Sequence, residues 1–158
     1  MEKINRRDNQ KVRDDIDDVF TKIFLLSLKM ENIGNKTLKK DQLTIKQFLL
    51  IASIESFDEP PSIKEVAERV STSHQNIKEI ADRLEKRGFI KIEKDEKDKR
   101  ILRLKTTEKN AQYWASRLDE HEDVIFALFN PFSDEEIYTF KVLINKFLNH
   151  LEENFYDE

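Results

Sequence analysis

The sequence predicts a mainly α-helical fold with one small β-hairpin. Its 158 residues include only 2 glycines and 3 prolines, whereas average usage of this pair is roughly 12%. Apolar residues recur along several long stretches at the spacing of one helix face. Sandwiches and barrels need a turn about every 8–12 residues, and phosphate-binding loops need clustered glycines. The composition therefore excludes both a sandwich or barrel fold and a phosphate-binding loop.

The first predicted helix spans residues 11–32. Its apolar stripe includes Ile16 and Phe20, and aspartates near its start suit the positive end of the helix dipole. Gly34 is expected to close this helix, because glycine favours the C-terminal cap. Residues 36–40 would then form a short basic loop.

Three further helix starts carry a capping box, in which a hydroxyl residue is followed three places later by Glu or Gln. Pro60 and Pro61 end the helix that the first box opens, because proline cannot continue a helix. The boxes are Thr44 with Gln47, Ser62 with Glu65, and Ser133 with Glu136.

Two short helices follow the prolines, separated by residues 71–73. The second spans 73–87 and ends at Gly88, where a left-handed cap requires glycine. The predicted core positions of this pair are Ile63, Val66, Ala67, Val70, Ile77, Ile80, Ala81 and Leu84.

A β-hairpin is predicted next, from short apolar-rich segments at residues 89–93 and 101–105. The charged run 94–100 would form its exposed tip. A single helix over 107–130 and a last helix after Ser133 complete the chain.

The domain organisation and the charge distribution agree with each other. We expect a central domain at residues 41–109, flanked by helical segments at 1–40 and 110–158. The formal net charge is −4, yet residues 78–109 carry 12 basic and 8 acidic side chains. The segment 110–158 carries 3 basic and 11 acidic side chains. Charge judged by segment therefore indicates a basic central surface, suited to a polyanion.

Other function classes are disfavoured by what the chain lacks. There is no cysteine, which removes disulfides and thiolate metal sites. His74, His121 and His150 are not at metal-ligand spacings, so we expect no metal, no cofactor and no enzymatic activity. No stretch of about 18 apolar residues occurs, and the N-terminus lacks the apolar core of a secretory signal. A cytoplasmic protein without a membrane partner is expected.

Two short helices followed by a hairpin are the plan of a winged helix-turn-helix. The fold class expected is thus a winged helix-turn-helix flanked by N- and C-terminal helices; their role as dimerisation helices comes from the family resemblance given below. In such a domain the start of the second helix faces phosphates and base edges in the major groove. The wing carries basic side chains toward the minor groove or the backbone.

The residues at these two places suit DNA. Gln75 and Asn76 can bond to adenine and His74 to guanine N7, while Asp98 can hold Arg100 in one rotamer. A polar helix start alone is more often a solvated cap, and a charged tip alone is usually just solvated, but their order and spacing favour DNA binding. The predicted DNA-contacting residues are Ser62, Ser73, His74, Gln75, Asn76, Lys78, Lys97, Asp98, Lys99 and Arg100.

Four motifs occur in one order along the central domain. They are L-T-x-x-Q at 43–47, D-R-L-E-K-x-G at 82–88, D-x-x-D-x-R at 95–100 and T-E-K at 107–109. In these motifs the chain resembles the MarR family of bacterial winged-helix transcription regulators. Asn110 replaces the family's usual glycine, and we expect it to adopt the left-handed conformation that asparagine tolerates. The start of the recognition helix differs from the common pattern, so the family's operator preferences do not carry over.

The resemblance implies a two-fold dimer, with interlocked first and last helices, that binds a pseudo-palindromic operator in double-stranded DNA. It also implies a response to a small aromatic effector. The apolar residues of the terminal helices are interpreted as part of the hydrophobic core or of the dimer interface rather than as a ligand-binding site. The expected function is a DNA-binding transcriptional regulator, most simply a repressor; the alternative is a winged-helix module that has lost DNA affinity and binds a protein partner. The predicted interface residues are Ile16, Phe20, Ile23, Phe140, Phe147 and Leu151.

Overall fold

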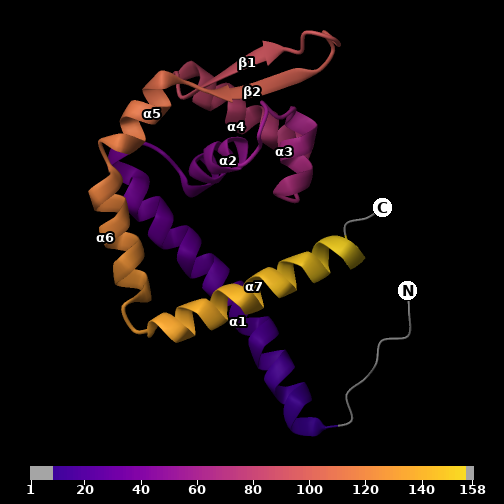
Figure 1. The fold of residues 1–158 in the computed structure, drawn as a ribbon, viewed down its shortest axis with the longest axis vertical. Coiled ribbons are helices and arrows are strands. Elements are labelled where there is room, and N and C mark those ends of the chain that lie inside the picture. The colour runs from indigo at the N-terminus through magenta and orange to yellow at the C-terminus, as the bar shows by residue number, and fades with distance from the viewer. Residues whose placement is uncertain (1–8, 156–158) are drawn as a thin grey trace. The chain divides into compact units, whose positions relative to one another are not determined.

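The computed structural model describes residues 9–155, which form helices and one β-hairpin (Figure 1). The chain divides into two compact units between Ala111 and Gln112, and each is described by itself. The predicted segments 1–40 and 110–158 also include residues 1–8 and 156–158, which lie outside the described part. The elements are α1 (Gln10–Leu38), the 3-10 helix η1 (Lys39–Asp41), α2 (Ile45–Glu55), α3 (Ile63–Arg69), α4 (His74–Lys86), β1 (Ile90–Lys94), β2 (Leu102–Thr106), α5 (Glu108–Ala115), α6 (Leu118–Phe129) and α7 (Asp134–Phe155).

The first unit has its core where α2, α3 and α4 meet the hairpin. Helix α4 contacts α2, α3 and β1, and β1 pairs with β2 in an antiparallel register that sets Ile90 opposite Thr106. Both strands begin one residue later than predicted. The tip of the hairpin projects beyond the helices (Figure 1). The mainly α-helical fold with a small hairpin is thus confirmed. The buried apolar side chains are Leu38, Leu43, Leu50, Ile51, Ile54, Ile63, Val66, Ala67, Ile77, Ala81, Leu84, Phe89, Ile90 and Leu104.

Local signals set most of the element boundaries. The three predicted capping boxes are present at the starts of α2, α3 and α7. At the first of them, the Thr44 hydroxyl accepts from the Gln47 amide at 3.2 Å, and the Gln47 side chain accepts from the Thr44 amide at 3.0 Å. Gly88 has φ 77°, as the predicted left-handed cap after α4 requires.

The prediction that Gly34 closes the first helix is wrong. Helix α1 continues through Gly34 to Leu38, so residues 36–38 are helical and the predicted basic loop is reduced to η1. Gly34 is needed for packing instead: a Cβ there would lie 2.7 Å from Ile45 Cδ1 and 3.2 Å from Ile45 Cβ. Glycine therefore lets α1 approach the start of α2 closely.

The single helix predicted over 107–130 is also wrong, because α5 ends at Ala115 and α6 begins at Leu118. At the break, the Ser116 hydroxyl donates to the Tyr113 carbonyl at 2.7 Å. The Arg117 amide donates to the Trp114 carbonyl at 3.0 Å, three residues back instead of four. Serine side chains compete for helix carbonyls in this way, and no glycine or proline marks the position.

Three single-residue expectations need correction. Val70 is 38% exposed rather than core, because it is the C-cap of α3 and lies outside the helix. Ile80 is only half-buried. Asn110 is not left-handed; it lies within α5, is buried, and donates from its side chain to Glu55 at 2.8 Å. Its amide therefore joins α5 to α2.

Hydrogen bonds join the end of α4 to the junction between α1 and α2. The Arg87 guanidinium donates to the Gln42 carbonyl at 2.6 Å and to the Asp41 carbonyl at 2.7 Å. Gln42 has φ 55°, an uncommon conformation for a residue other than glycine. Arg87 thus stabilises the tight turn that follows η1.

The long helices expose their apolar faces. Helix α1 buries only Leu38, while no side chain of α6 or α7 is buried. Phe20 is 62% exposed and Phe147 is 46% exposed. None of the helices within residues 9–155 is long and apolar enough to cross a membrane.

We expect Gly34→Ala to lower the free energy of unfolding by about 1–3 kcal/mol, the usual cost of overpacking. This outcome opposes helix propensity, which favours alanine over glycine by about 1 kcal/mol. Urea unfolding followed by circular dichroism would measure it. Asn32→Ala, at an exposed position of the same helix, is the control and should be neutral or stabilising. Equal stability of Gly34→Ala and Asn32→Ala would contradict the packing role.

Candidate nucleic-acid interface

The start of α4 is shaped by its cap. The Ser73 hydroxyl accepts a hydrogen bond from the Asn76 amide at 3.2 Å, which satisfies one of the free amides of the first turn. The side chains of His74, Gln75 and Asn76 are exposed. The positive end of the helix dipole lies at the same place, so this end of α4 suits a negative partner.

Three of the side chains predicted to contact DNA form hydrogen bonds or ion pairs with residues four positions away. Gln75 donates to Glu79 at 3.1 Å, and Asn76 donates to the Thr72 hydroxyl at 2.9 Å. Lys78 pairs with Asp82, four residues further along α4, at 3.1 Å. Exposed i,i+4 pairs contribute only about 0.3–0.5 kcal/mol. The binding of a polyanion could therefore replace these contacts at a small cost in free energy.

The wing tip presents one arginine in a fixed geometry. Arg100 donates from Nε to Asp98 Oδ1 at 3.0 Å and from Nη2 to Oδ2 at 2.8 Å. The expected contact of Asp98 with Arg100 is confirmed. This partner lowers the pKa of the Asp98 carboxyl, first through the guanidinium and then through the Arg100 amide. The Arg100 side chain is 90% exposed, and Lys97 and Lys99 are exposed beside it.

Asp95 organises the turn that carries this arginine. Its Oδ1 accepts from the amides of Lys97 and Asp98 at 2.8 and 3.0 Å. Its Oδ2 accepts from Arg103 Nε at 2.8 Å. The Asp98 amide, the Arg103 side chain and the Lys97 amide, in that order, lower the pKa of Asp95 to about 2. The carboxylate is thus held charged at the centre of the wing turn.

Arg103 extends this network to the start of α3. Its Nη1 donates to Glu65 at 2.9 Å and to the Pro60 carbonyl at 3.3 Å. Glu65 also accepts from the Ser62 amide at 2.6 Å, and the Ser62 hydrogen bonds are the largest cause of its lowered pKa. Ser62 is therefore a helix cap joined to the wing, and its predicted DNA contact stays a prediction.

Arg103 is not among the residues predicted from the sequence to form the interface. Its signal is present, since a charged residue between Leu102 and Leu104 must face away from the buried side of the strand. That pattern does not identify its partner. Glu65 lies 38 residues away in sequence, and only the tertiary fold brings the two together.

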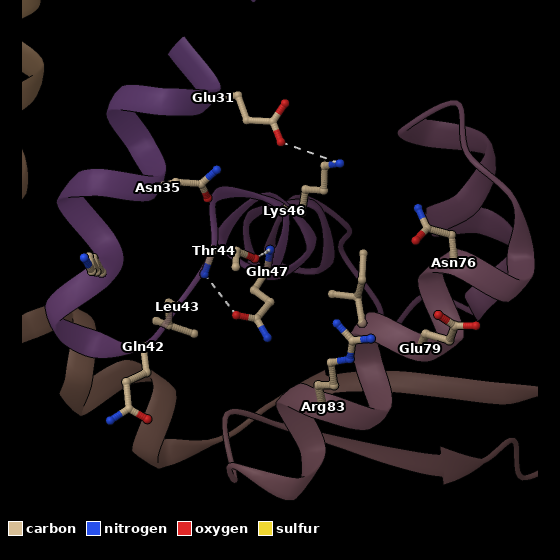
Figure 2. Close-up of a pocket in the computed structure, with 12 residues that line it drawn as sticks. Glu31, Asn35, Gln42, Leu43, Thr44, Lys46, Gln47, Asn76, Glu79 and Arg83 are labelled. Carbon is tan, nitrogen blue, oxygen red and sulfur yellow. Dashed lines mark hydrogen bonds and ion pairs between the residues drawn. The ribbon is translucent and has the colours of Figure 1, made fainter. Parts of the chain in front are cut away.

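A cavity of about 550 Å³ lies between α1, α2 and α4 (Figure 2). Most of the residues that line it are polar or charged, among them Glu31, Glu79 and Arg83. Lys46 lies 3.6 Å from Glu31 across it. Within residues 9–155, no three histidine, aspartate or glutamate side chains are grouped to hold a metal ion.

The Asp95 carboxyl should titrate at a pKa of about 2. Because this value lies below that of the unfolded chain, the contribution of Asp95 to wing stability should be complete above about pH 4 and decline as the pH falls toward its folded-state pKa. Carboxyl-carbon NMR of labelled protein would measure it. Arg103→Gln should raise the pKa of Asp95 and Lys91→Gln, a control on β1, should not. A wild-type pKa near 3.8, the value that Asp95 would have without these partners, would show that they do not hold the carboxylate.

Comparison with known proteins identifies the family. The MarR family model matches residues 43–102. The transcriptional repressor MprA of Escherichia coli (strain K12) is 30% identical over 121 residues, which is 75% of this chain and 68% of that protein. The HTH-type transcriptional regulator YybA of Bacillus subtilis (strain 168) is 26% identical over 138 residues, which is 87% of this chain and 91% of that protein.

A solved structure agrees with the fold. A cysteine-to-serine mutant of MarR from E. coli, complexed with operator DNA, matches with a TM-score of 0.74 at 21% identity, over 85% of this chain and 96% of that one. Its likeness supports a winged helix-turn-helix arrangement of α2 to β2. The chain therefore belongs to the MarR family of transcriptional regulators.

Proposed function

We propose that this protein is a repressor that binds a pseudo-palindromic operator as a two-fold dimer. The observation that carries the proposal is the pairing of an exposed polar helix start with a wing arginine held by Asp98. The likeness to MarR in complex with operator DNA supports DNA as the partner. The similar protein MprA, which is named a repressor, supports the direction of regulation.

The proposed dimer rests on the exposed apolar faces of α1 and α7. Ile16, Phe20, Ile23, Phe140 and Phe147 are each at least one-third exposed, and Leu151 is half-buried. Apolar helix faces that are exposed to this extent usually mark an interface. A two-fold dimer would set its recognition helices about one DNA turn apart, roughly 34–36 Å.

The remaining parts of the proposal concern setting and control. The protein would act in the cytoplasm, as a regulator rather than an enzyme, and a small aromatic effector would release it from DNA. The acidic segment at 110–158 would face away from DNA and limit non-specific binding. Leu43 and Ile80 are the two apolar residues among those that line the cavity in Figure 2.

Arg100→Ala should weaken binding to the operator roughly tenfold, the scale of a lost charge-assisted contact, and should reduce the salt slope by about 1. Gln75→Ala and Asn76→Ala should instead relax sequence preference, because they remove base contacts. Footprinting would first locate the operator and its half-site spacing. Mobility shifts at two salt concentrations, on operator and scrambled DNA, would then measure each variant.

Lys22→Ala is the control for DNA binding. It removes a positive charge from α1, which contains none of the residues proposed to contact DNA. If Asn76→Ala and Gln75→Ala weaken binding equally on all sequences, neither residue reads bases. If no DNA fragment is bound near physiological salt while a protein partner co-purifies, the chain is the alternative interaction module.

Phe147→Glu should convert the proposed dimer into a monomer at micromolar concentration, because a carboxylate cannot be buried unpaired in an apolar interface. Sedimentation velocity would measure the mass, and circular dichroism would show retained helix. Asn145→Glu makes the same charge change at an exposed position of α7, and should leave the dimer intact. A wild-type chain that sediments as a monomer would refute the proposed assembly.

A further inference from the structure

The two connections between the central domain and its flanking helices meet at the end of α4. Helix α1 leads into the domain through η1 and the turn at Gln42, and α5 follows β2 at the other end of the domain. Arg87, the C-cap of α4, contacts both connections. It occupies the position that the motif D-R-L-E-K-x-G leaves open, so the family resemblance does not account for this residue.

The side chain of Arg87 holds the connection to α1. Its guanidinium donates to the carbonyls of Gln42 and Asp41 at 2.6 and 2.7 Å, across the turn in which Gln42 has φ 55°. Next to this turn, the Asn35 side chain accepts a hydrogen bond from the Ile45 amide at 2.9 Å. The end of α1 is therefore joined to both α2 and α4.

The backbone of Arg87 holds the connection to α5. Its carbonyl accepts a hydrogen bond from Lys109 Nζ at 2.6 Å. The Arg87 guanidinium carbon and Lys109 Nζ lie 5.2 and 5.5 Å from the ring centroid of Phe89, which is buried. Cations at this distance are attracted to an aromatic face. One arginine and one ring thus hold the ends of both connections.

Two further contacts fix the first turn of α5. The Thr107 hydroxyl donates to the Gly88 carbonyl at 2.7 Å and accepts from the Asn110 amide at 3.2 Å. The buried Asn110 side chain donates at 2.8 Å to Glu55, the last residue of α2. The glycine that is usual at this position in the family has no side chain to make such a bond. We call Arg87, Phe89, Thr107, Lys109 and Asn110 the junction.

We propose that Arg87, Lys109 and Asn110 are positioning residues that set the spacing of the operator half-sites that this protein accepts. A helix is stiff because each turn is hydrogen-bonded to the next, so fixing the first turn of α5 fixes the direction in which the chain leaves the domain. The inference rests on the proposed function, in which a dimer formed by the long helices presents two recognition helices. A rigid junction allows one separation of those helices, whereas a loose junction allows several.

The first test needs no DNA. Amide hydrogen exchange of the full-length protein, followed by NMR, compares the wild type with Arg87→Gln. We expect exchange to be roughly 2- to 10-fold faster both at 42–43 and at 107–111, the scale of one or two lost hydrogen bonds. Both segments should respond, because the guanidinium that reaches Gln42 and the carbonyl that Lys109 contacts belong to one residue.

Lys86→Gln is the matched control, because it removes the neighbouring exposed cation of α4, and it should change exchange in neither segment. Faster exchange of Arg87→Gln at only one of the two segments would overturn the proposal, since the two connections would then be held independently.

The second test varies the operator. One base pair inserted at its centre moves a half-site by about 3.4 Å and turns it by roughly 34–36°. Mobility shifts give the ratio of the affinities for the native and the lengthened operator, and a single half-site reports on the base contacts. Arg87→Gln and Asn110→Ala should lower the ratio about 2- to 30-fold, the range by which mutations between two sites change their coupling, and leave half-site affinity unchanged.

Glu55 supplies a matched pair of variants. Glu55→Gln keeps an oxygen that can accept from Asn110 and should keep the wild-type ratio, whereas Glu55→Ala removes it and should behave as Asn110→Ala does. Sedimentation velocity must give each variant the wild-type mass, so that a changed ratio does not come from a lost dimer.

Two outcomes separate this inference from the proposed function. Equal loss of affinity for the native and the lengthened operator in Arg87→Gln and Asn110→Ala would overturn the role in spacing and leave these residues merely structural. If the wild type binds no DNA, the proposed function fails and the role in spacing fails with it, whereas the exchange experiment still decides whether the junction joins α1 to α5.

Discussion

The candidate interface depends on the ion-pair network around Arg103. Its guanidinium contacts Asp95 in the wing turn and Glu65 at the start of α3, and Glu65 completes the cap of that helix through Ser62. Isolated surface ion pairs contribute little to stability. Here one arginine serves two carboxylates that also accept backbone amides, so the wing and the helix-turn-helix are positioned together. In the proposed function, the exposed Arg100 depends on this turn for its position.

The apolar side chains of the chain serve two different purposes. Those between α2, α3, α4 and the hairpin are buried and form a small hydrophobic core. Those on α1 and α7 are not buried, with the exception of Leu38, although they are as apolar. The same hydrophobic effect that closes the core therefore favours a partner surface for the long helices. In the proposed dimer, association would complete the burial that one chain leaves unfinished.

Much of the fold and of the candidate interface could be predicted from local signals. Capping boxes, Gly88 and the contact of Asp98 with Arg100 involve residues within three positions of one another, so the pattern of residues is sufficient. The break at residues 116–117 is not predictable from the sequence, because it forms at an ordinary serine, with no glycine or proline to mark it. The role of Asn110 is likewise not predictable, because its partner Glu55 lies 55 residues away. Nothing near Asn110 in the sequence indicates that bond.

The sequence by itself determined the order of helices and strands, the wing with its basic tip, and the family. Caps, turns and periodic apolar faces require only neighbouring residues, and they are written directly in the chain. The tertiary structure decided why Gly34 is glycine, which carboxylates Arg103 pairs with, and why Asn110 is buried against Glu55. Close approach, long-range ion pairs and burial arise between distant segments, so they appear only when the chain is folded.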